Sequence, residues 1–187
     1  GSAHIFKQDG SGAWNEEVML QPTDKLSQSG SYIRFGGSVA IEGDYVVIGA
    51  TANMFYKTSG ASGFGSAHVY KRDGAGNWNS FDDLIAFNDD STFTNRTGGN
   101  TTFGITTAIQ GDEVFVGSGG STNQGGSAVR IFKLNSAGDA FEPSQFISPE
   151  PVAGDGFSKY GLAVNGDYMI VGAIYDDHNN NSISNTG

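Results

Sequence analysis

The sequence has no cysteine and only four prolines among its 187 residues. The absence of cysteine excludes disulfide bonds, cysteine–zinc centres and catalysis by a thiol. The scarcity of proline excludes a collagen-like chain and a proline-rich disordered one. Long apolar runs are also missing, since no stretch approaches the ~20 residues that a membrane-spanning helix needs. We therefore expect no insertion into a membrane.

Positively charged residues are scarce as well. Ten lysines and arginines stand against 20 aspartates and glutamates, so the formal net charge is −10. Such a surface repels the phosphate groups of nucleic acids and of anionic membranes. Binding to nucleic acid is therefore not expected. The negative charge is compatible with divalent cations and with a salty, extracellular setting.

Glycine and apolar residues are plentiful instead. The 29 glycines amount to about twice the ordinary usage of roughly 7%. Hydrophobic residues make up 37% of the chain and aromatic residues 12%. This apolar content is enough to build a packed core, which disordered chains cannot do.

One phrase occurs three times along the chain. Each copy has an aromatic residue followed by glycine, an apolar stretch, a Gly-Asp pair, and a second apolar stretch that ends in Gly-Ala or Gly-Ser. The last copy is two residues shorter than the others. The copies are FGGSVAIEGDYVVIGA (35–50), FGITTAIQGDEVFVGS (103–118) and YGLAVNGDYMIVGA (160–173).

A second phrase follows the first two copies, and its third copy stands at the start of the chain. Its copies begin at residues 1, 65 and 126. Internal similarity at a fixed spacing is typical of repeat architectures. The pattern predicts three repeats of about 62 residues, one of them split between the two ends. The copies are GSAHIFKQDGSGAW (1–14), GSAHVYKRDGAGNW (65–78) and GSAVRIFKLNSAGDAF (126–141).

Each phrase reads as a β-hairpin. In the first phrase, Gly43 lies between two apolar, β-rich runs and supplies the positive φ of a tight turn. Both runs are apolar on both faces, which is typical of strands packed between other sheets. In the second phrase a strand leads into a glycine-rich turn, and an aromatic residue follows two or three residues after the last glycine of that turn in each copy. We interpret these aromatic residues, Trp14, Trp78 and Phe141, as core positions.

Two hairpins make one four-stranded antiparallel meander per repeat. Such a sheet cannot bury both apolar faces alone, but stacking copies around an axis does so, as in a β-propeller. The predicted fold is therefore all-β, with three four-stranded propeller-type blades. The predicted divisions are the second half of the split blade (1–34), two whole blades (35–102 and 103–159), and the first half of the split blade (160–187).

The first phrase resembles the FG-GAP repeat, the blade motif of integrin α-subunit propellers and of many bacterial surface proteins. The second phrase resembles its bacterial variant, and together the copies cover nearly the whole chain. The resemblance implies β-propeller blades and an extracellular or cell-surface location. Calcium-binding members carry an Asp-x-Asp/Asn-x-Asp-Gly loop, and none of the three copies has this loop intact.

The best candidate metal site is the polar segment that follows the third copy of the first phrase. The resemblance places calcium loops at this point of the repeat, and oxygen donors suit Ca²⁺. The alternative is a solvated loop that joins two strands. The candidate ligands are Asp176, Asp177, Asn179 and Asn181. Three Asn-x-Ser/Thr sequons predict glycosylation at Asn95, Asn100 and Asn180.

Other polar residues recur at equivalent positions, which indicates structural roles. The aspartates of the Gly-Asp pairs, Asp44, Asp112 and Asp167, are expected to shape turns by bonding to local backbone. His4 and His68 also occupy equivalent positions. Adjacent acids on a strand point to opposite faces and do not form an acid–base pair. The sequence has no nucleophile elbow, P-loop, dinucleotide fingerprint or HExxH motif, so we expect no enzyme.

Three functions remain open. In the first, the chain is an extracellular structural or adhesion protein that assembles with other copies of itself, because residues 1–20 complete the split blade of a neighbour. In the second, it is a module of a larger adhesion propeller that binds a glycan or protein ligand, with or without calcium. The third is a propeller enzyme, which would need acids or histidines clustered across blades. The pattern favours the first.

Overall fold

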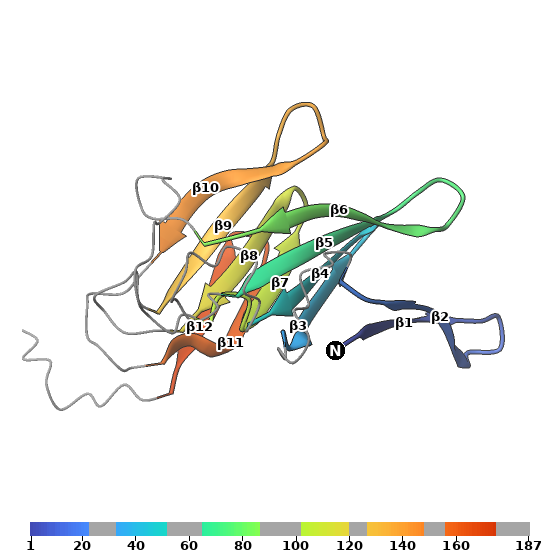
Figure 1. The fold of residues 1–187 in the computed structure, drawn as a ribbon, viewed down its shortest axis with the longest axis horizontal. Helices are drawn as coiled ribbons and strands as arrows, with labels where there is room; N and C mark the ends of the chain where they lie inside the picture. The colour runs from blue at the N-terminus through green and yellow to red at the C-terminus, as the bar shows by residue number, and fades with distance from the viewer. Residues whose placement is uncertain (23–32, 52–64, 87–101, 120–126, 148–155, 175–187) are drawn as a thin grey trace, which may run out of the picture.

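The computed structural model describes residues 1–22, 33–51, 65–86, 102–119, 127–147 and 156–174. All regular structure in these residues is β-strand, as predicted (Figure 1). The strands are β1 (Ala3–Gln8), β2 (Trp14–Leu20), β3 (Phe35–Glu42), β4 (Tyr45–Ala50), β5 (Ser66–Arg72), β6 (Trp78–Leu84), β7 (Thr106–Gln110), β8 (Glu113–Ser118), β9 (Ala128–Leu134), β10 (Phe141–Ile147), β11 (Phe157–Asn165) and β12 (Tyr168–Ala173).

The strands form four antiparallel sheets. Two are complete four-stranded meanders, β3-β4-β5-β6 and β7-β8-β9-β10, and two are hairpins, β1-β2 and β11-β12. The turn glycines Gly43, Gly111 and Gly166 have φ of 55°, 60° and 57°, where a side chain would be strained. The prediction of four-stranded antiparallel blades in an all-β chain is confirmed.

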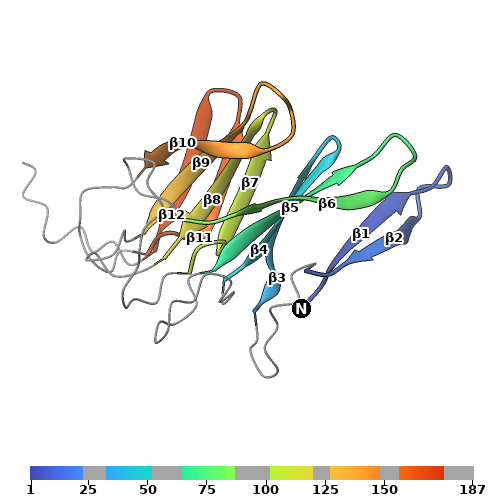
Figure 2. The same cartoon turned by 45° about the horizontal axis from the view of Figure 1, so that its top comes forward.

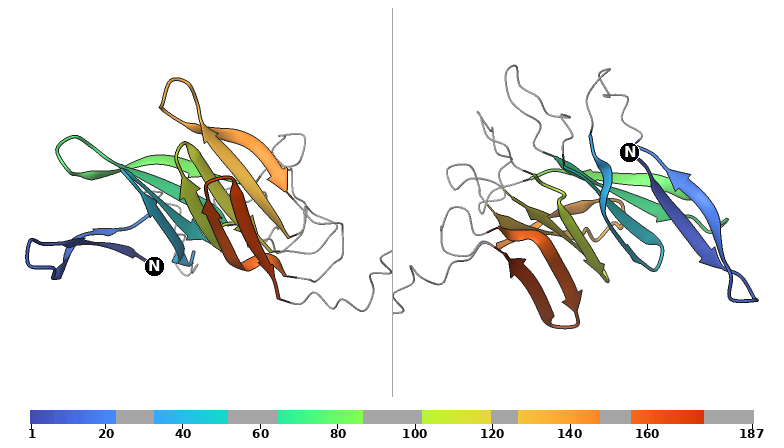
Figure 3. Two further views of the ribbon diagram at one scale, coloured as in Figure 1. Left: turned by 180° about the vertical axis from the view of Figure 1, so that it is seen from behind. Right: turned by 90° about the horizontal axis from the view of Figure 1, so that it is seen from below.

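The sheets follow one another face to face in chain order. The hairpin β1-β2 lies at one end, the hairpin β11-β12 at the other, and the two complete sheets lie between them (Figures 2 and 3). The first strands of successive sheets are neighbours, since β3 contacts β7 and β7 contacts β11. This radial order is the arrangement of blades in a propeller.

Three apolar clusters fill the spaces between the four sheets. The first joins Ile5 and Leu20 of the β1-β2 hairpin to Val46 and Ile48 of β4. The opposite face of the same sheet, with Val47 and Val69, packs on β8 and β9. The third cluster lies between the β7–β10 sheet and the β11-β12 hairpin. Each complete sheet thus packs on a neighbour on both sides, which explains why its strands are apolar on both faces. Part of β3 in the first sheet is an exception, since Val39 and Ile41 are exposed.

The recurring aromatic residue of the second phrase is only partly a core position. Phe141 is buried, and Trp78 is partly buried against the first cluster. Trp14, at the same place in the N-terminal hairpin, is 67% exposed. The difference has a simple cause, because no described part of the chain covers the outer face of that hairpin.

In the third copy of the first phrase, the first strand starts earlier than the sequence comparison of the copies predicts. Phe157 pairs with Ala173 as Phe35 pairs with Ala50, so β11 begins before the aligned Tyr160. Ser158 takes the place of the glycine after the aromatic residue, with a φ of 59°. Its hydroxyl is buried and donates to the carbonyl oxygens of Ser118 and Ala128, at 3.1 and 2.9 Å. These bonds hold a serine where the other copies use glycine.

Within the described residues, no helix is long and apolar enough to cross a membrane.

Candidate functional site

The two terminal hairpins leave strand edges open. In each complete sheet the second strand pairs with the third, β4 with β5 and β8 with β9. Within the described residues, β12 pairs only with β11, and β1 pairs only with β2. One edge of β12 and one edge of β1 therefore present backbone N–H and C=O groups without a strand partner, a feature that favours pairing with another chain.

Exposed apolar side chains lie on both terminal hairpins and on β3. On β12, Tyr168 is 83% exposed and Ile170 is 73% exposed. On β3, Val39 and Ile41 are 60% and 61% exposed. Isolated exposed apolar residues are normal, but a group of them on one sheet face indicates a contact surface. The outer face of the β1-β2 hairpin adds Phe6, Trp14 and Met19.

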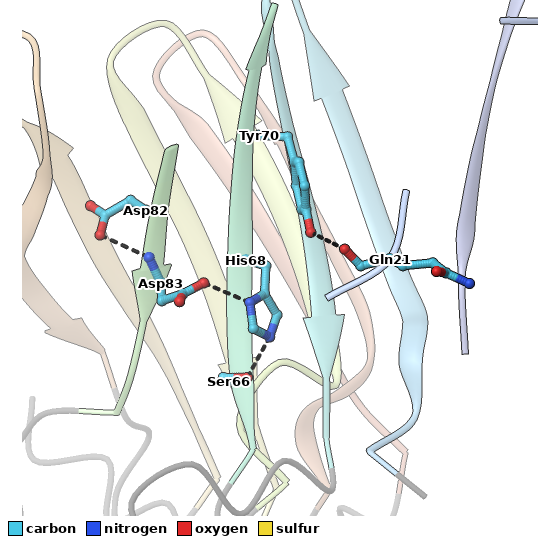
Figure 4. A network of polar contacts seen from close by, with 6 residues as sticks. All are labelled: Gln21, Ser66, His68, Tyr70, Asp82 and Asp83. Carbon is cyan, nitrogen blue, oxygen red and sulfur yellow. Dashed lines mark hydrogen bonds and ion pairs between the residues drawn. The ribbon is translucent and has the colours of Figure 1, made fainter. Parts of the chain in front are cut away.

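A Ser–His–Asp chain of contacts lies on the first complete sheet (Figure 4). The Ser66 hydroxyl lies 2.9 Å from His68 Nε2, and His68 Nδ1 donates to Asp83 Oδ1 at 2.6 Å. The order matches that of a catalytic triad. Ser66 and His68 are both buried between sheets, however, so a substrate cannot reach the serine oxygen. The network instead ties β5 to β6.

The equivalent positions elsewhere support this structural role. In the N-terminal hairpin, His4 contacts Ser2 at 3.1 Å and Glu16 at 2.9 Å. In the second complete sheet, Arg130 stands at the position of the histidine: it pairs with Val116 of β8 as His68 pairs with Ile48 of β4. Arg130 donates to the Ser118 hydroxyl at 2.7 Å and stacks on Phe146 at 4.9 Å. The position thus holds a large, nitrogen-bearing polar side chain in each sheet, which favours a structural role.

Asp82 and Asp83 act on opposite sides of β6. Asp83 accepts from His68, whereas Asp82 Oδ2 accepts from the backbone N–H of Phe141 in the next sheet at 2.7 Å. The two adjacent carboxylates thus have different partners. Asp82 serves as a link between two sheets.

We expected the aspartates of the Gly-Asp pairs to bond to local backbone, but the side chains of Asp44 and Asp112 instead contact cations on another strand. Asp44 Oδ1 accepts from Arg72 Nη2 at 2.7 Å, and Asp112 Oδ2 lies 3.5 Å from Lys133 Nζ. Arg72 and Lys133 lie at the ends of β5 and β9, so each aspartate ties a hairpin turn to the third strand of its sheet. The sequence of the turn alone could not predict these cations, because they lie on another strand of the sheet.

Asp9 and Asp73 shape the glycine-rich turns. Asp9 accepts from the side chain of Ser11 and from the backbone N–H groups of Ser11 and Ala13, at 2.6, 2.8 and 3.1 Å. These bonds lower the pKa of Asp9 from 3.8 to about 2, and the bond from the Ser11 hydroxyl has the largest effect. Asp73 is held by Asn77, whose backbone hydrogen bond is the main cause of its lowered pKa.

The predicted calcium site lies outside the described residues, so calcium binding by Asp176, Asp177, Asn179 and Asn181 remains a prediction. The same holds for the sequon residues Asn95, Asn100 and Asn180. Among the residues that the structure describes, no group of three or more His, Cys, Asp or Glu side chains could hold a metal ion.

Residues 14–70 match the family model of the FG-GAP repeat. The match runs from β2 through most of β5, and so spans the junction between the N-terminal hairpin and the first complete sheet. No curated protein matches the chain. The number of further copies rests on the sequence alignment alone. With its blade-like sheets and this match, the chain is a β-protein that carries an FG-GAP repeat.

Proposed function

We propose that the protein is a non-enzymatic structural or adhesion protein that assembles with other copies of itself. The observation that carries this proposal is the pair of open-edged hairpins at opposite ends of the stack of sheets. The order β11-β12 followed by β1-β2 repeats the order β3-β4-β5-β6. Two hairpins from different copies therefore supply the parts of one four-stranded blade.

The geometry of such a contact is head-to-tail. A head-to-tail contact gives a closed ring when the rotation closes and a filament when it does not. Two copies that exchange hairpins would form a ring of six blades, within the range of about 4–8 known for propellers.

The family supports the location and the class. FG-GAP repeats are typical of extracellular or surface proteins and are generally non-enzymatic. The net charge of −10 suits such a setting and opposes contact with nucleic acid. An extracellular or cell-surface role is therefore part of the proposal.

A second candidate is a ligand-binding or calcium-binding module of a larger propeller. It is favoured by the hard oxygen donors that follow β12 in the sequence, beginning at Asp176. A glycan or protein ligand would then bind on the loop side. A propeller enzyme is less well supported, because the Ser66–His68–Asp83 network is enclosed between sheets.

The test is the mass in solution, measured by light scattering with and without EDTA. We expect oligomers well above the 19.5 kDa of one chain. A stable monomer under both conditions would refute self-assembly and favour the binding module. Oligomers that fall apart in EDTA would show that a metal ion is part of the assembly.

A further inference from the structure

We propose that β12 of one copy pairs with β1 of a second copy, antiparallel, with Tyr168 opposite Lys7 and Ala173 opposite Ser2. The joined sheet then covers Val39 and Ile41 on β3 of the second copy. The inference rests on the proposed self-assembly and specifies the contact that makes it.

The register comes from the two complete sheets. In the first, Tyr45 pairs with Lys71 and Ala50 pairs with Ser66. In the second, Glu113 pairs with Lys133, at the same positions relative to the turn and to the strand end. Tyr168 follows the turn aspartate as Tyr45 does, and Lys7 stands where Lys71 stands in the second phrase. The same pairing applied to the terminal hairpins places Tyr168 opposite Lys7.

The faces of the two hairpins agree with this register. Met169 and Val171 of β12 pack on the β7–β10 sheet, so the alternating Tyr168 and Ile170 point away from it. Ile5 of β1 packs on the β3–β6 sheet of its own chain. In the proposed register Ile170 is opposite Ile5, and residues that pair across strands share a face. Tyr168 and Ile170 would therefore turn toward the β3–β6 sheet of the second copy.

The β3–β6 sheet of the second copy has an exposed apolar surface that Tyr168 and Ile170 would cover. Ile41, Ile109 and Val164 each lie two residues before a turn glycine. Ile109 and Val164 pack in the clusters between sheets, covered in turn by the preceding sheet. Ile41 is 61% exposed, because no described strand precedes β3 in the way that β3 precedes β7. The β11-β12 hairpin of another copy supplies that preceding strand.

The space around Gly172 gives independent support for the contact between copies. A Cβ at Gly49 would overlap the carbonyl oxygen of Gly104, and a Cβ at Gly117 would lie 2.8 Å from that of Ser158. In both cases the backbone of the next sheet occupies the space that a side chain would need. Gly172 holds the same position in β12, yet the nearest described atoms to such a Cβ are those of Gly161 at 3.8 Å. Among the described residues, none occupies at Gly172 the space that the other two glycines give to the next sheet.

The second copy contains the group that fits this space. Gly104 lies between Gly49 and the carbonyl oxygen of Ser66, which leaves no room for a Cβ on Gly104. Gly36 lies against the carbonyl oxygen of Ser2 in the same manner. Gly36 is thus placed to approach Gly172 of another copy as Gly104 approaches Gly49.

The turns of successive sheets are also clasped together. Glu42 Oε2 accepts from the Gly111 N–H at 2.7 Å, and Gln110 Oε1 accepts from the Gly166 N–H at 2.7 Å. Asn165 holds the equivalent position in the last hairpin, before Gly166. In the proposed contact it faces the Gly43 N–H of the second copy.

The occupant is a second copy and not the same chain. The two hairpins lie at opposite ends of the stack, with two complete sheets between them (Figures 2 and 3). The β1-β2 hairpin is held there by its apolar cluster and by the Tyr70 hydroxyl, which donates to the Gln21 carbonyl oxygen at 2.7 Å. Closure within one chain would have to break or strongly bend this stack.

Disulfide cross-linking tests the register, because the chain has no cysteine of its own. Lys7→Cys in one preparation and Tyr168→Cys in another are mixed and oxidised. Both positions are exposed, so neither change should affect folding. Paired residues have Cα atoms about 4.5–5.5 Å apart, within the range of a disulfide. We expect a reducible band at the mass of two chains.

The matched control mixes Lys7→Cys with Ile174→Cys. Ile174 is also exposed but lies six residues beyond Tyr168, about 20 Å along a strand. We expect no cross-link from this pair. Oligomers in light scattering without the Lys7–Tyr168 cross-link would overturn the register while leaving self-assembly intact. Monomers in light scattering would overturn both.

A third preparation separates the two kinds of closure. In the double variant Lys7→Cys with Tyr168→Cys, contact between copies gives disulfide-linked oligomers. An internal disulfide at the mass of one chain would overturn the proposal in favour of closure within the chain.

Glycine variants test the junction itself. Gly172→Ala should fold like the unaltered chain at high dilution, as judged by circular dichroism and thermal unfolding. It should need at least a tenfold higher protein concentration to assemble. Gly49→Ala should instead fail to fold stably, because its Cβ meets backbone of the same chain. Normal assembly of Gly172→Ala would overturn the proposed approach of Gly36.

Discussion

At the scale of single residues, polar side chains in this protein act mainly as ties between strands. Asp44, Asp82 and Asp83 each accept hydrogen bonds from a different strand or sheet. Asp9 and Asp73 close the turns of the second phrase. The carboxylates are thus spread along the sheets and do not converge on a common site within the described residues.

The turn of the N-terminal hairpin should depend on pH through Asp9. Its pKa is about 2 in the folded chain and 3.8 without the turn bonds. The ionised carboxylate therefore stabilises the turn fully above pH ~4, and this contribution is lost as the pH falls toward 2. We expect carbon-detected NMR titration of the Asp9 carboxyl group to give a midpoint near 2. Ser11→Ala should raise that midpoint, and an unchanged value would contradict the assigned cause.

His68 and His4 form a matched pair for testing the buried network. The side chain of His68 is 3% exposed and that of His4 is 41% exposed. His68→Ala removes a buried partner of Asp83 and should cost about 2 kcal/mol of unfolding free energy. His4→Ala should stay within about 0.5 kcal/mol, since exposed changes have small effects. Urea denaturation measures both, and equal losses would show that burial does not set the value of the network.

At the scale of strands and sheets, each element needs a neighbour on both faces. The β7–β10 sheet finds both within the chain, and the β3–β6 sheet does so except at Val39 and Ile41 of β3, whereas each terminal hairpin has one covered and one exposed face. The inner faces of the hairpins therefore contribute to folding, and no residue that the structure describes covers the outer faces.

Two isoleucines on the hairpins separate these roles. Ile5 is buried against β4, and Ile5→Ala should destabilise the fold by about 2 kcal/mol through lost burial and a cavity. Ile170 is 73% exposed, so Ile170→Ala should leave the stability of the dilute monomer within about 0.5 kcal/mol. It should nevertheless weaken assembly. Urea denaturation and light scattering report the two effects, and a loss of stability in both variants would argue against the division.

At the scale of the whole molecule, the charge opposes assembly. Each chain carries −10, so copies repel one another at low ionic strength. Between about 0.01 and 1 M salt the screening length falls from about 30 to about 3 Å. Association should therefore strengthen over this range, as measured by light scattering at fixed protein concentration. Weaker association at high salt would point instead to an interface held by opposite charges.

The sequence by itself determined the strands, the turns and the four-stranded meander. These follow from local patterns: turn glycines such as Gly43 require positive φ, and runs apolar on both faces require sheets on both sides. The match of the FG-GAP repeat to residues 14–70 agrees with that reading.

The tertiary structure decided the features that depend on partners distant in the chain. The start of β11 at Phe157 depends on Ser158 bonding to Ser118 and Ala128. The cation beside Asp44 lies 28 residues along the chain, at Arg72. Above all, the structure placed the two hairpins at opposite ends of the stack. No local pattern could show this, because the position of a sheet depends on which apolar faces pack together.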